Sequence, residues 1–190
     1  MRVIAGEFKG RKLTCLAGKK IRPTSDRIRE ALFSILLQKI DNALVLDLFA
    51  GTGALGIEAL SRGAAKSIFV DISKQAIQII NKNIELLKLE KRTKVIECDA
   101  STVFSSNILE DFKFDLIFVD PPYNKGFLQS TLMNIDLLKI MGDDSIIIVE
   151  HSKHANNLQK MPELDFFDKK TYGNTSISFF KQKTKINLRG

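Results

Sequence analysis

The sequence is poor in the residues that build cross-links and zinc sites. Its 190 residues include only two cysteines, Cys15 and Cys98, which lie far apart and form no CxxC pair. Its only histidines, His151 and His154, have no cysteine nearby. Disulfide frameworks and structural zinc sites need Cys and His at short, repeated spacings. The sequence therefore argues against both kinds of scaffold, and we expect no metal.

Long apolar runs are also missing. Runs such as 116–119 and 146–149 have four residues, whereas a membrane-spanning helix needs about 20. At the N-terminus, Gly6 and Glu7 interrupt the chain before the apolar core of a signal peptide could form. With 44% hydrophobic and 27% charged residues, we expect one globular domain with a small extension, located in the cytoplasm.

The net charge of +7 is unevenly distributed. Residues 1–40 carry +7, residues 41–150 carry −5 and residues 151–190 carry +5. Basic segments on an acidic body suit a polyanion, because each neutralised phosphate releases counterions. A merely solvated basic surface is the alternative that charge alone leaves open.

Apolar β-rich runs alternate with helical patterns through the middle of the chain. We expect strands at 43–48, 67–71, 94–98, 114–119 and 145–150. Helices are expected at 54–62, after Ser73 and around Leu128, Leu132, Ile135 and Leu138. This alternation predicts a parallel α/β sheet. Two further runs, 166–171 and 176–181, predict a closing hairpin with at least one antiparallel strand.

The N-terminal 40 residues are expected to form an extension to the sheet domain of residues 41–190. Residues 24–40 predict an amphipathic helix with Ile28, Leu32, Ile35 and Leu36 on one face and Arg27, Arg29 and Glu30 off it. Residues 1–23, with three glycines among basic residues, predict a basic hairpin or arm. The residues expected to grip phosphates are Lys9, Arg11, Lys12, Arg22, Arg27 and Arg29.

The segment 51–56 matches G-x-G-x-x-G between a strand and a helix, with Asp71 twenty residues beyond Gly51. Read literally, this is a nicotinamide-dinucleotide fingerprint. Asp47 argues against it, because a carboxylate at the end of the first strand would repel a pyrophosphate. The same carboxylate favours the sulfonium and ammonium of S-adenosylmethionine (SAM). Glycines that serve only tight packing are a third interpretation.

The predicted SAM site extends to the neighbouring strand ends. Asp71 can accept hydrogen bonds from the ribose, and Gly51 and Gly53 leave room for a ligand, whereas Gly56 serves packing. Asp99 can accept from the adenine amine, or it can cap the segment that follows. The expected cofactor-binding residues are Asp47, Phe49, Ala50, Gly51, Thr52, Gly53, Asp71, Ile72, Asp99 and Ala100.

The segment Asp120-Pro121-Pro122-Tyr123 follows the fourth strand and is expected to open onto the same edge of the sheet. Two prolines remove two backbone donors and leave carbonyl acceptors. Hydrogen bonds from a nucleobase amine to Asp120 and to the Pro121 carbonyl would aim its lone pair at a sulfonium methyl. Tyr123 can stack on the base, which must be flipped or unpaired to enter.

These residues resemble the RsmD family, bacterial SAM-dependent methyltransferases that act on N2 of a guanine in 16S ribosomal RNA. The resemblance covers essentially the whole chain. Its segments are 2–6, 10–13, 22–27, 30–33, 47–63, 120–123, 149–152 and 172–175. It implies a seven-stranded Rossmann-like sheet with a reversed strand, an N-terminal β-hairpin for RNA, and S-adenosylhomocysteine as product. It also implies a substrate presented in the assembling or assembled small ribosomal subunit; we expect a monomer.

Asp-Pro-Pro-Tyr alone is shared with enzymes that methylate adenine N6. A DNA adenine-N6 methyltransferase is therefore the second hypothesis, which the absence of a separate target-recognition region disfavours. The third is an inactive SAM-binding module or ribosome-assembly factor, against which the intact segment 120–123 speaks.

Overall fold

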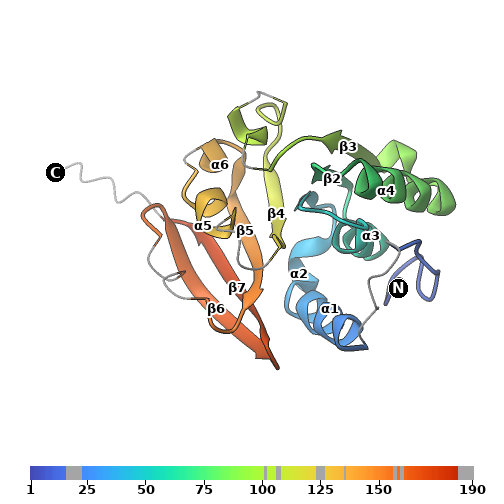
Figure 1. The fold of residues 1–190 in the computed structure, drawn as a ribbon, viewed down its shortest axis with the longest axis horizontal. Helices are drawn as coiled ribbons and strands as arrows, with labels where there is room; N and C mark the ends of the chain where they lie inside the picture. The colour runs from blue at the N-terminus through green and yellow to red at the C-terminus, as the bar shows by residue number, and fades with distance from the viewer. Residues whose placement is uncertain are drawn as a thin grey trace.

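The computed structural model describes residues 1–15, 23–100, 102–105, 108–122, 127–134, 136–155, 158 and 161–183. The described residues form a seven-stranded sheet in the order β3-β2-β1-β4-β5-β7-β6 (Figure 1). The strands are β1 Leu44–Leu48, β2 Lys66–Asp71, β3 Thr93–Glu97, β4 Phe114–Val119, β5 Met141–Ser152, β6 Leu164–Tyr172 and β7 Thr175–Gln182. β1 to β5 pair in parallel, and β7 is antiparallel to both of its neighbours. The predicted sheet with a reversed C-terminal strand is confirmed.

The central strands β1 and β4 are mostly apolar because both faces of the sheet are covered. On one face, β4 packs against α1 (Pro23–Ile35), where the rings of Phe33 and Phe118 lie 5.7 Å apart between centroids. On the other face, Ile117 and Val119 belong to a second buried cluster. This double cover fixes the sheet, and the strand ends therefore form a rigid edge.

The helices after β1 and β2 each have one of the predicted caps. α3 spans Ala54–Ser61, and Gly63 just beyond it adopts φ +110°. α4 spans Lys74–Leu87, and the Ser73 hydroxyl accepts a hydrogen bond from the Ala76 amide at 3.4 Å. Two short turns, η1 (Glu90–Arg92) and η2 (Val103–Ser105), flank β3. The caps predicted at Gly63 and Ser73 are confirmed.

The N-terminal helix differs from the prediction. The single helix expected over 24–40 is divided at Leu36 into α1 and α2 (Leu37–Ile40). Ile28, Leu32 and Leu36 are buried as expected, but Ile35 is 43% exposed. The buried positions are the pairs 28–29 and 32–33 followed by Leu36, which centres the buried face away from Ile35.

The helix expected around Leu128 to Leu138 is also divided, into α5 (Phe127–Leu132) and α6 (Asp136–Lys139). Asn134 explains the break. Its side-chain Oδ1 accepts from the Asp136 amide at 2.9 Å and its carbonyl accepts from the Leu137 amide at 3.1 Å. An asparagine that bonds to nearby backbone in this way replaces the continuing helical ladder with a new start. Ile135 lies outside the described residues.

The first thirteen residues fold back on themselves as a short hairpin, with one antiparallel bridge between Arg2 and Lys12. The expected β-hairpin is therefore reduced to a single bridge within the described residues. Val3 and Leu13 are buried against α3 and α4, and α1 shares a core with β4. The described parts of the predicted extension pack on the sheet domain instead of forming a core of their own.

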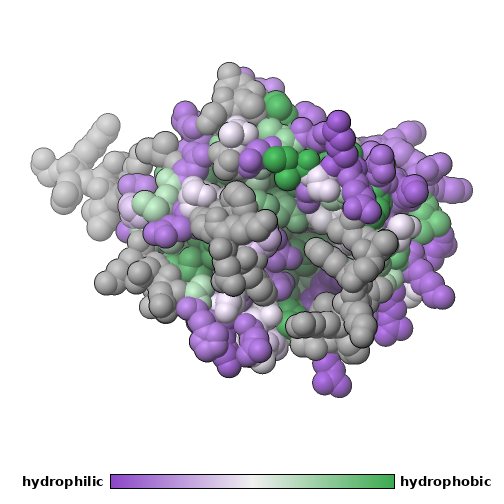
Figure 2. Space-filling view, viewed as in Figure 1, coloured by the Kyte–Doolittle hydropathy of each residue, from purple (hydrophilic) through white to green (hydrophobic). Residues whose placement is uncertain are grey.

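Hydrophilic side chains dominate the periphery of the face in Figure 2, and hydrophobic side chains show through toward its middle. None of the helices in the described ranges is long and apolar enough to cross a membrane. Within the same ranges, no three His, Cys, Asp or Glu side chains are grouped as metal ligands would be.

Candidate active site and nucleic-acid interface

The pairing of β1 with β4 brings the two predicted motifs together. Leu48, the last residue of β1, is paired with Val119, the last residue of β4. The loop of residues 49–53, which carries the first glycines of the motif and is called the glycine loop below, follows directly after Leu48. Asp120 follows directly after Val119. Because parallel strands end at one edge, the loop and the Asp120 turn begin side by side at the carboxyl edge of the sheet.

The glycine loop has a tightly wound backbone. Phe49, Gly51 and Gly53 all have positive φ, at 59°, 59° and 75°. Ala50 anchors the loop, since its amide donates to the Val70 carbonyl at 3.1 Å and its carbonyl accepts from the Gly53 amide at 2.7 Å. These bonds hold the loop in a tight turn at the start of α3.

Asp71 ties the loop to the end of β2. Its Oδ2 accepts from the Gly51 amide at 2.8 Å, and its Oδ1 accepts from the Ser73 amide at 2.8 Å. Each carboxylate oxygen has a second lone pair, so these two bonds do not use up its acceptor capacity. The next residue, Ile72, is a large apolar side chain that is 65% exposed. The carboxyl edge of the sheet therefore places a hydrogen-bond acceptor, Asp71, beside an exposed apolar side chain, Ile72.

The three glycines of the motif face different surroundings. Among the described residues, a Cβ on Gly51 would meet only the Phe49 carbonyl oxygen, at 3.8 Å, so these residues leave that side of the loop open. A Cβ on Gly53 would lie 3.2 Å from Phe69, which assigns this glycine to packing instead of the ligand clearance we predicted. A Cβ on Gly56 would lie 2.4 Å from both Phe69 and Ser67. The packing role predicted for Gly56 is confirmed.

Asp47 lies beneath the loop and is 1% exposed. Its Oδ2 accepts from the Gly56 amide at 2.9 Å, which ties the end of β1 to the first turn of α3. Burial raises the pKa of Asp47 to about 7, the hydrogen bond from Gly56 opposes this shift, and the negative charge of Asp71 adds to it. Asp47 is therefore a carboxyl group whose charge depends on pH near neutrality.

The remaining predicted cofactor residues surround the same edge. The Thr52 hydroxyl lies 3.6 Å from the Met1 sulfur, so the loop contacts the N-terminus. The Asp99 carbonyl accepts from the amides of Thr102 and Val103, both at 3.0 Å, and starts the turn after β3. Ala100 is buried. At the end of β4, Asp120 is half-buried, Pro121 is buried and Pro122 is exposed; Tyr123 lies outside the described residues.

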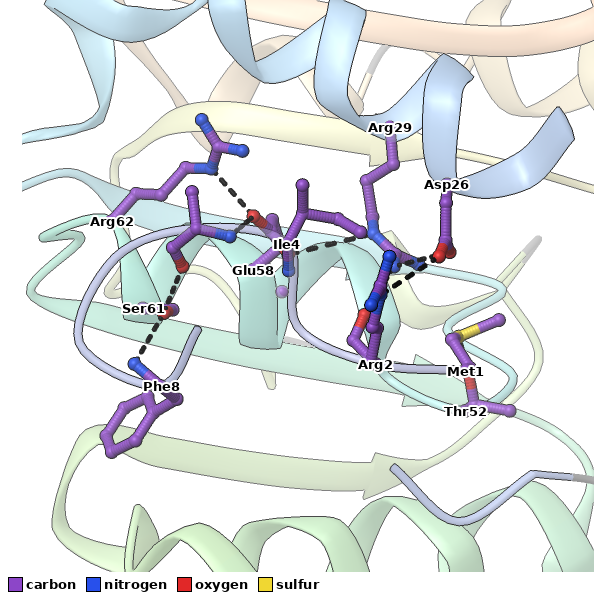
Figure 3. A network of polar contacts seen from close by, with 12 residues as sticks. Met1, Arg2, Ile4, Phe8, Asp26, Arg29, Thr52, Glu58, Ser61 and Arg62 are labelled. Atoms are coloured by element: carbon purple, nitrogen blue, oxygen red, sulfur yellow. Dashed lines mark hydrogen bonds and ion pairs between the residues drawn. The ribbon is translucent and has the colours of Figure 1, made fainter. Parts of the chain in front are cut away.

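A buried glutamate holds the N-terminal hairpin on α3 (Figure 3). Glu58 accepts from the Ile4 amide at 2.8 Å and from the Ala5 amide at 3.0 Å. It also accepts from Nε of Arg62 at 2.7 Å and lies 3.7 Å from Nε of Arg29. One carboxylate therefore joins the hairpin, α3 and α1.

Ser61 adds a second attachment on α3. Its hydroxyl accepts from the Phe8 amide at 3.0 Å and donates to the Ala5 carbonyl at 2.6 Å. Its own carbonyl accepts from the Glu7 amide at 2.7 Å. A Cβ on Gly6 would lie 1.8 Å from this carbonyl, so only glycine permits the close approach. The hairpin is thus fixed next to the helix that follows the glycine loop.

The prediction that Arg29 contacts phosphate is wrong in this structure. Its side chain is 5% exposed, and Nη2 donates to the Arg2 carbonyl at 2.6 Å and to Asp26 at 3.1 Å. The helical spacing placed it beside the apolar face, but the ion pairs with Asp26 and Glu58 draw it inward. Lys9, Arg11, Lys12 and Arg27 are exposed as expected. Arg22 lies outside the described residues.

Asn83 is a site residue that the sequence analysis missed. It is 0% exposed, its Oδ1 accepts from the Thr14 amide at 2.7 Å, and its Nδ2 donates to the carbonyls of Thr14 at 3.1 Å and Thr52 at 3.0 Å. The available signal was a polar residue three positions after Ile80 and four positions before Leu87, because an amide on the apolar face of a helix is buried and needs partners.

Comparisons with known proteins identify the family of the chain. The family model described as conserved hypothetical protein 95 matches residues 1–181. The chain is 38% identical to "Putative rRNA methyltransferase YlbH" of Bacillus subtilis, over 96% of this chain and all of that protein. It is 36% identical to ribosomal RNA small subunit methyltransferase D of Escherichia coli, over 85% of this chain and 79% of that protein.

Solved structures show the same fold. "Putative methyltransferase yhhF" from Escherichia coli superimposes with a TM-score of 0.82 at 34% identity, covering 96% of this chain and 98% of that one. More distant structures, described as SAM-dependent or as complexed with SAH, share the fold alone. A model match over nearly the whole chain, with relatives above 30% identity, places this protein in the family of conserved hypothetical protein 95, the RsmD family that its sequence resembles.

Proposed function

We propose that this protein transfers a methyl group from SAM to the exocyclic N2 amine of a guanine in 16S rRNA of the small ribosomal subunit. The observation that carries the proposal is the pairing of Leu48 with Val119, which starts the glycine loop and the Asp120 turn at adjacent strand ends. The names of the relatives, rRNA methyltransferases with the same fold, supply the substrate class. Guanine N2 rests on the family resemblance.

The carboxyl edge fits SAM in three respects. The described residues leave space beside Gly51 for a ligand, and Asp71 offers remaining acceptor capacity for ribose hydroxyls. The exposed Ile72 offers an apolar surface for adenine, with Asp99 near the turn after β3. Asp47 is buried below the loop and its pKa is raised to about 7, so the charge that it carries above that pH would act on a cation through the loop instead of by contact. When bound, SAM supplies an electrophilic methyl group on a sulfonium.

Asp120 and Pro121 position the nucleophile. An exocyclic amine on a base is a weak nucleophile because its lone pair is delocalised into the ring. Hydrogen bonds from the amine to the Asp120 carboxylate and to the Pro121 carbonyl would turn the lone pair out of conjugation and aim it along the line of displacement. The extra proton then leaves to Asp120 or to water. Tyr123 would stack on the flipped base.

The N-terminal hairpin and α1 would hold the RNA. Lys9, Arg11, Lys12 and Arg27 are exposed, and Arg22 belongs to the same basic stretch. Phosphate contacts of this kind fix position without reading sequence. Residues 1–40 would then form the RNA-binding part and residues 41–190 the catalytic part of a monomer acting on the assembling or assembled subunit.

The test is transfer of a labelled methyl group from SAM to unmethylated small subunits, naked 16S rRNA and unmethylated DNA, followed by nucleoside mass spectrometry. We expect N2-methylguanosine in rRNA, and the preferred substrate identifies the assembly state. N6-methyladenine in DNA would replace the proposal with the DNA methyltransferase hypothesis. Binding of SAM without transfer to any of the three substrates would favour a binding module.

A further inference from the structure

A groove of about 460 Å³ lies between the N-terminal hairpin and the first turns of α1. Arg2, Lys9 and Gly10 line it from the hairpin, and Asp26, Arg27 and Glu30 line it from α1. Its volume falls within the roughly 300–1,000 Å³ of small-ligand sites. The groove is therefore large enough for one nucleotide.

The charged side chains of the groove differ in whether an ion pair holds them. Asp26 is held by ion pairs with Arg2 at 3.6 Å and Arg29 at 3.1 Å. By contrast, across the ranges that the structure describes, no ion pair reaches the exposed side chains of Arg27 and Glu30, although both are on α1 three residues apart. Residues at this spacing are neighbours on one helix face. Among the described residues, neither the guanidinium nor the carboxylate that the groove presents has an ion-pair partner.

A groove that only gripped phosphates would exclude Glu30, because a carboxylate repels a phosphate and weakens sequence-independent binding. The edge of a nucleobase is the complementary ligand. A carboxylate accepts from exocyclic amines and ring N–H groups, and a guanidinium donates to ring nitrogens and carbonyl oxygens. Lys9, at the hairpin side of the groove, can neutralise the phosphate of the same nucleotide.

α1 connects the groove to β4, the strand that ends at the candidate active site. Phe33, three residues after Glu30, packs on Phe118, two residues before Asp120. The hairpin side is fixed as well, because Glu58 binds the amides of Ile4 and Ala5. A nucleotide in the groove would therefore be held by a rigid frame connected to the catalytic strand.

We propose that this groove binds one unpaired nucleotide of the RNA substrate other than the target, with Glu30 and Arg27 reading its base and Lys9 contacting its phosphate. This inference rests on the proposed function, which it extends from methyl transfer to choice of RNA. It makes Glu30 and Arg27 specificity-determining residues, whereas the other basic residues of the extension supply affinity.

The Glu30→Gln variant tests the proposal because a general cationic surface and a base-contacting carboxylate predict opposite changes in RNA affinity. If the groove is a general cationic surface, removing a negative charge tightens binding to unmethylated small subunits. If Glu30 accepts from a base, Glu30→Gln weakens binding by about tenfold, in the range of a good base contact, and the salt dependence is unchanged. The matched control is Glu90→Gln, the same change at an exposed position on η1.

Two further variants complete the test. Arg27→Lys keeps the charge but loses the planar fork, so it should also weaken binding. Lys9→Ala should weaken binding and reduce the magnitude of the salt slope by about one. Binding by Glu30→Gln that equals or exceeds that of Glu90→Gln would overturn the proposal.

The readouts separate this inference from the proposed function. Glu30→Gln should raise KM for the RNA and leave kcat and the Kd of SAM unchanged, since the groove touches neither the methyl donor nor the target amine. If the wild-type protein transfers no methyl group, the proposed function fails. The comparison of binding by Glu30→Gln and Glu90→Gln still decides whether the groove reads a base.

Discussion

The side-chain amide of Asn83 donates to the carbonyl oxygen of Thr52 at 3.0 Å, which joins the middle of α4 to the glycine loop. The same amide group exchanges two hydrogen bonds with the backbone of Thr14. One fully buried side chain therefore connects the N-terminal segment, α4 and the candidate cofactor loop. The loop conformation depends on a residue that does not belong to it.

Replacing Asn83 should disturb both stability and cofactor binding. Asn83→Leu removes the partners of the Thr14 amide and of the Thr52 carbonyl, and each buried group left unpaired costs about 1–3 kcal/mol. We expect a lower free energy of unfolding in urea and a higher Kd for SAM by titration calorimetry. Asn81→Leu, the same change at an exposed position on α4, should alter neither. Equal SAM affinity in the two variants would contradict the link to the loop.

The raised pKa of Asp47 predicts that the free energy of unfolding depends on pH. Its pKa is raised from 3.8 to about 7 by burial, so the folded state holds a proton that the unfolded state releases. The contribution of Asp47 to the free energy of unfolding is therefore largest below about pH 4 and decreases as the pH rises toward about 7. Asp47→Asn keeps an acceptor for the Gly56 amide and removes this titration.

Urea unfolding of wild type and Asp47→Asn between pH 4 and pH 8 measures the effect. We expect Asn to gain stability relative to Asp as the pH increases, by at most about 4 kcal/mol, since one pKa unit corresponds to about 1.4 kcal/mol. A difference between the two proteins that stays constant over this range would show that Asp47 does not titrate there.

Alanine at Gly51 and at Gly56 should separate cofactor binding from folding. At Gly51 the space is open but φ is +59°, which costs an alanine about 1–2 kcal/mol, and the new methyl group would project toward the approaching ligand. At Gly56 the methyl group would lie 2.4 Å from Phe69 and Ser67, which forces α3 away from β2. We expect Gly51→Ala to lose mainly SAM affinity and Gly56→Ala to lose mainly stability. The Kd of SAM and the free energy of unfolding are measured for each variant. The reverse pattern would reassign the two glycines.

The features that could be predicted from the sequence are those set by local chemistry. The strand from Phe114 to Val119 has the predicted bounds because a short, mostly apolar run in this alternation has few other solutions. The cap at Ser73 and the turn at Gly63 depend on one residue each. The placement of Asp120 next to the glycine loop followed from the usual strand order of such sheets.

The features that were missed depend on contacts between distant segments. Arg29 is charged and lies off the apolar face by helical spacing, yet Glu58, 29 residues later, buries it. Asn83 has partners only because Thr14 and Thr52 fold against it. Gly53 lies in a ligand fingerprint, but Phe69 from the next strand decides its role. Residue spacing predicts which face of a helix or strand is apolar, but it does not predict which distant segment packs on that face.

Glu58 should be essential for holding the N-terminal hairpin. Glu58→Ala removes the counter-charge that the buried Arg29 shares with the half-buried Arg62, and it removes the acceptor of the Ile4 and Ala5 amides. Breaking a buried ion pair from one side costs about 3–5 kcal/mol. We expect a loss of this size in urea unfolding, against a near-neutral Glu85→Ala at an exposed site on α4. A loss below about 1 kcal/mol, the range of a surface pair, would show that the network is not cooperative.

Asp120 provides the sharpest test of the chemistry, because it is proposed to act on the amine and not on the cofactor. Asp120→Ala should abolish methyl transfer to small subunits, while the Kd of SAM by calorimetry stays at the wild-type value. Asp120→Asn retains one acceptor oxygen and should keep part of the activity, since a neutral acceptor orients the amine less strongly than a charged one. Asp143→Ala, at an exposed carboxylate on β5, controls for the loss of charge. Transfer at the wild-type rate by Asp120→Ala would contradict the assignment of Asp120 as the residue that positions the base.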